Sequence, residues 1–216
     1  MLHTRLAGIA VGAVLGIAAS WLVLPIRTSS AVRARTAAAL AALTGLLEAD
    51  WCDHRAVRMA RARFCHRVEQ LGVTTAPLRT LAALPLPRAL SVRRRRSVDA
   101  LRAVAALRHC VEPVGDLATA VTSAPDALAG DPSLRGRRGE VAAHTLAVRR
   151  AIGRRPAPPG APAPAPPAKA RPTGPEAAVT SGALAAIDAQ LDVLTEVFGR
   201  PPIPPASHPA AATARS

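Results

Sequence analysis

An uncharged apolar run at residues 6–24 constrains this chain more than any other feature of its sequence. As an α-helix, its 19 residues rise roughly 28 Å, close to the ~30 Å hydrocarbon thickness of a bilayer. A helix also satisfies every backbone hydrogen bond within the segment, as lipid requires. Arg5 and Arg27 flank the run and Pro25 ends it. We therefore predict a transmembrane helix within residues 1–27.

A secretory signal peptide is the alternative interpretation, because "MLHTR" at 1–5 resembles a short basic leader start. However, the apolar run is longer than the ~7–15 residues of a signal-peptide core. The small-residue triplet "SSA" at 29–31 is also a poor cleavage site. These two features favour the spanning helix.

The arginines around the run predict its orientation. Arg27, Arg33 and Arg35 follow it closely, whereas only Arg5 precedes it. By the positive-inside rule, the C-terminal side is cytoplasmic. The 3 cysteines of the chain are then in a reducing compartment, where we expect no structural disulfide.

Glycines recur at every fourth position of the run, at Gly8, Gly12 and Gly16, and so share one helix face. Small residues on one face let a second helix approach closely, which drives association in lipid. The pattern predicts packing against further transmembrane helices, from the same protein, a partner protein or a second copy. A composition generally rich in glycine and alanine is the alternative explanation.

The chain as a whole is basic and poor in aromatic residues, with a formal net charge of +14 and 2% aromatic content. The densest basic run, Arg93, Arg94, Arg95 and Arg96, is expected in a proline-containing loop. No aromatic residues accompany it to stack on bases, so we expect no nucleic-acid partner. Contact with membrane lipid headgroups and a simple solvated loop both remain open.

Apolar periodicity predicts helices throughout residues 28–153, which we interpret as a basic cytoplasmic helical domain. The clearest of these helices is predicted at 55–71, where an apolar stripe from Val57 to Leu71 lies opposite five arginines. Gly72 is expected to end this helix. Prolines predict interruptions at 73–96, apart from a short turn at 78–83, and a loop at 123–136. The other predicted helices are 29–50, 97–112 with a resumption beyond Pro113 to about 122, and 138–152.

Three further segments complete the chain. Residues 154–175 are a Pro/Ala-rich linker, expected to be extended and disordered, and 200–216 are a disordered tail. Between them, 176–199 has an apolar stripe with acidic residues beside it, and Thr173 and Glu176 offer a capping box. We expect this acidic amphipathic helix to pair with the basic helix at 55–71, in this chain or in a neighbouring one. No strand pattern occurs, so the predicted fold class is all-α, an antiparallel helical bundle after one transmembrane helix.

No motif of a known enzyme class occurs, and the carboxylates are scattered, so we predict a protein that is not an enzyme. Each cysteine has a histidine nearby: Cys52 with His54, Cys65 with His66, and Cys110 with His109. None of these pairs has zinc-ligand spacing, and adjacent helical residues point about 100° apart. We therefore expect no metal site and no cofactor.

The beginning of the chain resembles a known family. The motif of Arg5, Gly8 and Gly12, the sequence "LVLPIR" at 22–27 and the following Ala/Leu/Arg-rich helix are similar to part of the fusaric acid resistance (FUSC) family. The similar part is the last transmembrane helix and the cytoplasmic segment after it. The similarity covers about residues 1–50, and Ile9 stands where family members often have threonine.

The resemblance implies efflux of aromatic acids or related compounds across the inner membrane, by a unit with several transmembrane helices. We expect this chain to be the C-terminal portion of such a transporter and inactive alone. The alternative is a single-pass, membrane-anchored helical scaffold that binds lipid headgroups or a partner protein.

Overall fold

The computed structural model describes residues 12, 30–83, 91–153 and 174–199, and every statement on structure below refers to these ranges. Within them the secondary structure is α-helical and contains no strand, which confirms the all-α class. A helix at residues 30–48, here the 30–48 helix, comes first. It is followed by α2 (His54–Ala83), α3 (Ser91–His109), α4 (Val111–Ser123), α5 (Pro125–Gly130), α6 (Pro132–Ile152) and α7 (Pro175–Gly199).

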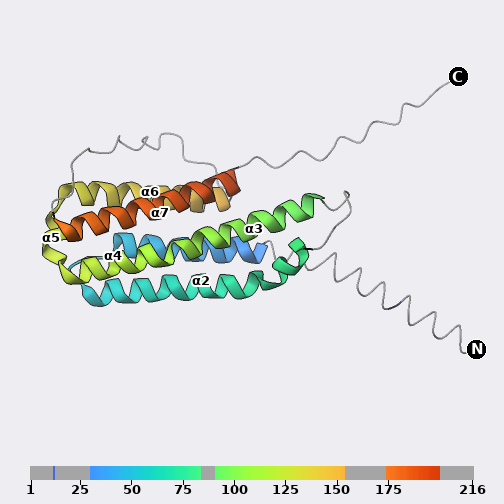
Figure 1. Ribbon diagram of the computed structural model, residues 1–216, viewed down its shortest axis with the longest axis horizontal. Coiled ribbons are helices and arrows are strands. Elements are labelled where there is room, and N and C mark those ends of the chain that lie inside the picture. Colours follow the sequence, from blue (N-terminus) through green and yellow to red (C-terminus); the bar gives the residue numbers. More distant parts are fainter. Residues whose placement is uncertain (1–11, 13–29, 84–90, 154–173, 200–216) are drawn as a thin grey trace, which may run out of the picture.

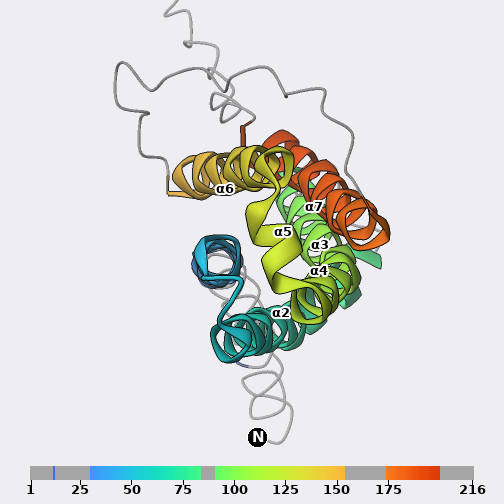
Figure 2. The ribbon, with the colours of Figure 1, turned by 90° about the vertical axis from the view of Figure 1, so that its left-hand side faces the viewer.

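The helices form a closed bundle, seen end-on in Figure 2. Around its axis the order is the 30–48 helix, α2, the α3/α4 pair, α7 and α6, while short α5 crosses one end. Neighbours are antiparallel except α6 and α7, which run in the same direction (Figure 1). Gly153 and Gly174 therefore lie at opposite ends of the bundle.

The core consists of the aliphatic stripes that the sequence predicted. Phe64 of α2, Leu107 of α3 and Leu184 of α7 are fully buried among leucines from the 30–48 helix. The stripe of α2 from Val57 to Leu71 is buried throughout, and its arginines are exposed. Val98 is an exception to the predicted stripe of α3, because it is 47% exposed.

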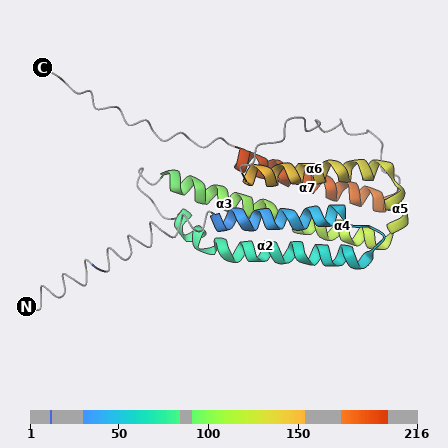
Figure 3. The same ribbon diagram turned by 180° about the vertical axis from the view of Figure 1, so that it is seen from behind.

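Helix α2 does not end at Gly72, as the sequence suggested, but continues through Gly72 and Pro77 to Ala83. Gly72 is buried and helical, and a Cβ atom there would collide with the Arg108 guanidinium of α3. Gly72 therefore lies in the interior of the helix, beside the Arg108 side chain, and not at a helix end. Pro77 removes one backbone bond but does not stop the helix, whose last turns bend (Figure 3).

The arginine run at 93–96 is also placed differently from the prediction. It lies in the first turns of α3, which begins at Ser91, and not in a loop. Arginine is a good helix former, and the prolines at 85 and 87 both precede the helix. Beyond the run, α3 ends at His109 and α4 begins at Val111, so the break lies at Cys110 and not at Pro113, which is in the first turn of α4.

The predicted loop at 123–136 is largely helical, because its two prolines begin helices instead of breaking them. Pro125 opens α5 and Pro132 opens α6, and the first turn of a helix needs no proline N–H. The Asp131 carboxylate caps α6 by accepting hydrogen bonds from the backbone N–H groups of Ser133 and Leu134.

At the same end, Arg138 of α6 joins its helix to the end of the 30–48 helix. Its guanidinium donates to the carbonyls of Leu47 and Ala49 and lies over Trp51, 4.6 Å from the ring centroid. These contacts satisfy carbonyl groups that a helix C-terminus leaves without partners. Burial lowers the pKa of Arg138, although an arginine remains charged at any ordinary pH.

Helix α7 is the one described helix whose length and composition would allow it to cross a membrane. Here its apolar stripe, which includes Leu184, Ile187 and Leu191, is buried in the bundle. The predicted pairing of this acidic helix with α2 within the chain is wrong. Its carboxylates face α3 and α6 instead, where Arg102 pairs with Glu196 at 2.7 Å and Arg137 pairs with Asp188 at 2.9 Å.

The predicted transmembrane segment at 6–24 lies outside the described residues, except for Gly12. Gly12 is helical and exposed, and a Cβ atom placed there would meet nothing within 4 Å. The predicted linker up to residue 173, the tail at 200–216 and the Thr173 half of the capping box also lie outside the described residues. Gly174, just before α7, has a positive φ of 112° that suits glycine.

Candidate functional site

One end of the bundle is rich in arginine. It is the end where the 30–48 helix begins, where α2, α6 and α7 finish and where α3 starts (Figure 1). Two carboxylates described near it are Asp99 and Glu196, and Glu196 is paired with Arg102. We call this the basic end, and its exposed arginines are Arg33, Arg35, Arg79, Arg95, Arg96, Arg149 and Arg150.

The opposite end carries most of the acidic connections. Glu48, Asp50 and Asp53 lie around the turn into α2, and Asp126, Asp131 and Glu176 lie at the starts of α5, α6 and α7. Arg55, Arg135 and Arg138 offset part of this charge. The bundle is therefore electrostatically polar along its axis, with its excess positive charge at the basic end.

A groove of about 540 Å³ opens at the basic end, between the start of the 30–48 helix and the end of α6. Arg33 borders it from one helix, and Arg149 and Arg150 border it from the other. Ala34, Ala37, Leu146 and Ile152 contribute apolar surface, and no carboxylate lines it. Its volume lies within the roughly 300–1,000 Å³ of typical ligand sites.

A second, smaller cavity of about 160 Å³ lies beside the groove, between the 30–48 helix, α3 and α7. Arg33 and Arg96 line it together with Asp99, and Val197 and Phe198 supply apolar surface. The carboxylate reduces the positive charge of this cavity. The groove at α6 is accordingly the more favourable place for an anion.

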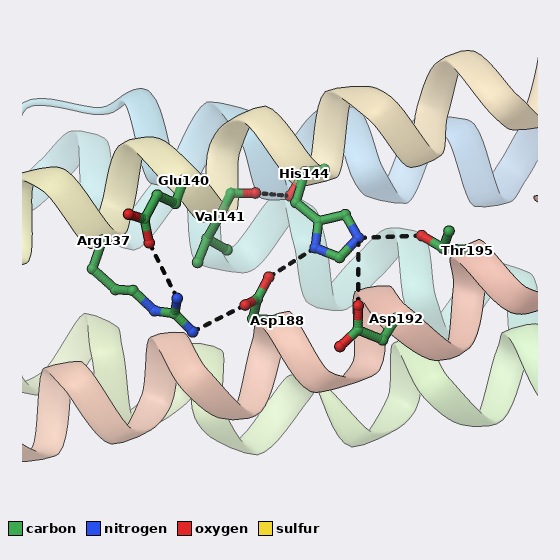
Figure 4. A network of polar contacts seen from close by, with 8 residues as sticks. Arg137, Glu140, Val141, His144, Asp188, Asp192 and Thr195 are labelled. Carbon is green, nitrogen blue, oxygen red and sulfur yellow. Dashed lines mark hydrogen bonds and ion pairs between the residues drawn. The ribbon is translucent and has the colours of Figure 1, made fainter. Parts of the chain in front are cut away.

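A network of polar contacts joins α6 to α7 in the middle of the bundle (Figure 4). Asp188 is its centre, because its two oxygens contact Arg137 Nη2 at 2.9 Å and His144 Nδ1 at 2.8 Å. Arg137 also pairs with Glu140 at 3.1 Å. The other ring nitrogen of His144 lies 3.2 Å from Thr195 Oγ1 and 3.9 Å from Asp192.

The order Thr195, His144, Asp188 resembles that of a hydrolase triad, in which a carboxylate orients the histidine that activates a hydroxyl. Such catalysis also needs free N–H groups that stabilise an oxyanion. Thr195 lies inside α7, where backbone N–H groups are engaged in the helix. The groove and the cavity described above are lined by other residues. The geometry fits a structural link between two helices.

The cysteines and histidines are distributed over the bundle. Cys52 is exposed, Cys65 is half-buried and Cys110 is buried, and all three are free thiols. Burial raises the pKa of the Cys110 thiol to about 12. Partial desolvation and the neighbouring Asp50 carboxylate raise the pKa of Cys52. No cluster of metal-ligating side chains occurs in the described ranges.

The residues predicted from the sequence as functional are only partly described. Arg95 and Arg96 are exposed at the basic end, and the backbone places Arg93 and Arg94 in the preceding turn of α3. Arg5, Gly8 and Gly16 lie outside the described residues. Sequence reasoning missed the groove with Arg33, Arg149 and Arg150. The adjacent arginines in the last turn of α6 were the available signal.

Comparisons with protein-family models, with curated proteins and with solved structures gave no match to this chain.

Proposed function

We propose that this chain is a non-enzymatic, membrane-anchored helical bundle that works as a scaffold on the cytoplasmic face of the inner membrane. Residues 6–24 cross the bilayer, and the basic end of the bundle faces the lipid headgroups. One observation carries the proposal. The basic end is also the end at which the described bundle begins, at residue 30, only a few residues after the apolar run.

The electrostatics support this arrangement. An anionic cytoplasmic leaflet attracts nearby arginines by about 1 kcal/mol each at close range, and the effect falls off within a Debye length. The acidic connections lie at the far end of the bundle and so avoid repulsion from the lipid. A bundle anchored at its basic end thus presents its more acidic end to the cytoplasm, where a partner protein could bind.

Extraction of membranes with alkaline carbonate tests the anchor. The full chain should stay in the membrane pellet, and so should a control with the swaps Val14→Leu and Leu15→Val. Replacing Val14 and Leu15 by arginine should release the protein, because each such charge costs roughly 2.5–3.5 kcal/mol at a helix centre. Release of the unchanged chain would contradict the proposal.

The orientation is tested with reporter fusions after Ser216. A fluorescent protein should be bright there, and a periplasmic phosphatase should be inactive. The opposite pair of results would contradict a cytoplasmic bundle.

The resemblance to the FUSC family adds a proposal on context, in which the bundle belongs to an exporter of aromatic acids. A path for an anionic solute needs polar groups facing a lined cavity. The run at 6–24 offers only Ser20 and the Trp21 indole. Expression of this chain alone in an efflux-deficient host should therefore give no resistance to fusaric acid. Restored resistance with intact membranes would contradict this expectation.

A further inference from the structure

The groove between the 30–48 helix and α6 brings together positive charges from distant parts of the sequence. Arg33 is on one wall, and Arg149 and Arg150 are on the other. Within the described ranges, neither Arg149 nor Arg150 forms an ion pair or hydrogen bond. Three arginines that border one groove give it a positive potential, which favours an anion there.

The rest of the groove is apolar. Ala34 and Ala37 lie on the 30–48 helix, and Leu146 and Ile152 lie on α6. Guanidinium groups bind phosphate oxygens through pairs of charge-assisted hydrogen bonds, whereas the aliphatic surface suits a hydrocarbon chain. Arginines combined with such a surface fit an anionic amphiphile better than a small, fully hydrated anion.

We propose that this groove binds one anionic phospholipid, with the headgroup phosphate held by Arg33, Arg149 and Arg150 and the start of an acyl chain on the apolar surface. This inference rests on the proposed function, in which the basic end faces the membrane. It goes further, because it assigns a discrete lipid site in addition to a general attraction to the surface.

A structural role for two of the arginines is the competing explanation. Arg149 and Arg150 lie in the last turn of α6, where positive charge complements the helix dipole. That role involves neither Arg33, which lies on a different helix, nor the apolar surface of the groove. A lipid site requires all three arginines, and this difference separates the two explanations.

The test is native mass spectrometry of the full chain in detergent micelles, titrated with short-chain phosphatidylglycerol. Phosphatidylcholine and inorganic phosphate are titrated in parallel. The groove variants are Arg149→Gln/Arg150→Gln and, separately, Arg33→Gln. The matched control, Arg58→Gln/Arg63→Gln, removes the same charge as the double variant from exposed positions of α2, away from the groove.

The unchanged chain should retain one phosphatidylglycerol, with little binding of phosphatidylcholine. Each groove variant should weaken that binding by at least about tenfold, because it removes charge-assisted hydrogen bonds. The control should change it by less than about twofold, because exposed charges act mainly through a screened field. Equal helical content by circular dichroism verifies that the variants fold. If the double variant unfolds, the Arg33→Gln variant decides the test, because it leaves α6 intact.

Three results would overturn the lipid site: equal binding by all variants, equal binding of both lipids, or inorganic phosphate that binds as tightly as phosphatidylglycerol. The last result would mean a site for a free anion. The micelle measurement does not depend on carbonate extraction. The micelle titration can therefore refute the lipid site without refuting the membrane anchor. The membrane anchor is refuted only by release of the unchanged chain in the carbonate extraction.

Discussion

His144 Nδ1 lies 2.8 Å from Asp188 Oδ1, and this contact joins α6 to α7, two parallel helices with a long connection between them. Asp188 also accepts a hydrogen bond from Arg137, so one carboxylate holds two side chains of α6. The side chain of Asp188 is 26% exposed, which limits the screening of both contacts by water. The network therefore fixes the register of α7 in addition to its burial in the core.

Replacement of Asp188 tests this role. Asp188→Ala should lower the free energy of unfolding by about 1–2 kcal/mol, because it leaves two half-buried donors without their acceptor. Urea unfolding of the full chain in detergent, followed by circular dichroism, measures the change. The control is Asp192→Ala, whose 76% exposed side chain lies 3.9 Å from His144. It should cost less than about 0.5 kcal/mol, and equal losses would contradict the assignment.

The Asp131 cap of α6 predicts a dependence of stability on pH. The Ser133 hydroxyl and the backbone N–H groups of Ser133 and Leu134 donate to its carboxylate and hold its pKa below the usual value. A lowered pKa in the folded state means stabilisation that is present above the unfolded pKa, about 3.9, and lost as the pH falls through the folded value.

Asp131→Ala should therefore cost about 1 kcal/mol at pH 7, and the difference from the unchanged chain should shrink as the pH falls below 4. Asp131→Asn keeps a capping oxygen without the charge and is the control. Urea unfolding at a series of pH values measures both differences. A cost of the alanine variant that stays constant down to pH 2 would refute the charged cap.

The three thiols should differ in reactivity. The thiolate is the reactive form, and burial raises the pKa of Cys110 to about 12. At pH 8, N-ethylmaleimide should modify exposed Cys52 much faster than Cys110, which should react only when the bundle unfolds. Peptide mass spectrometry after timed quenching follows each site. Modification of Cys110 as fast as Cys52 in native protein would show that the core differs from the one described.

The glycine face of residues 8, 12 and 16 remains a prediction about helix packing. Gly12→Leu should weaken association in a membrane two-hybrid assay, because a larger side chain keeps the partner helix away. Val14→Leu is the control, since Val14 lies off that face. If both variants associate like the unchanged chain, the glycines have no packing role.

The sequence was most informative where a buried stripe repeats. Val57, Phe64 and Leu71 recur at helical spacing and are all buried, because periodicity reports directly which face meets the core. The prolines of residues 123–136 led to a wrong prediction of a loop, because a proline in the first turn of a helix does not break it. Pro132 follows a capping aspartate and opens α6, and this signature could have been recognised from the sequence alone.

The groove could not be predicted in the same way. Arg33 and Arg149 are far apart in the sequence, and their proximity depends on the order of helices around the bundle. No local pattern encodes that order. The partner of α7 was missed for the same reason, because Arg137 and His144 of α6 are less conspicuous in the sequence than the arginines of α2.

Energy transfer to the membrane surface tests most directly whether the basic end faces the lipid. In one chain a fluorescent energy donor is attached to the native thiol of Cys52. In the other it is placed on the thiol introduced by Ala76→Cys, with Cys52→Ser. Both chains carry Cys65→Ser, and both labelled positions are exposed. Position 52 lies just before α2, and from His54 to position 76 the helix rises about 33 Å. Each full-length chain is reconstituted into phosphatidylglycerol vesicles that contain lipids with an acceptor on the headgroup.

Position 76 is near the basic end and position 52 is near the acidic end. With the basic end against the bilayer, transfer should be efficient from position 76 and weak from position 52. Equal transfer from both positions, or stronger transfer from position 52, would contradict a bundle that stands on the membrane with its arginines toward the lipid.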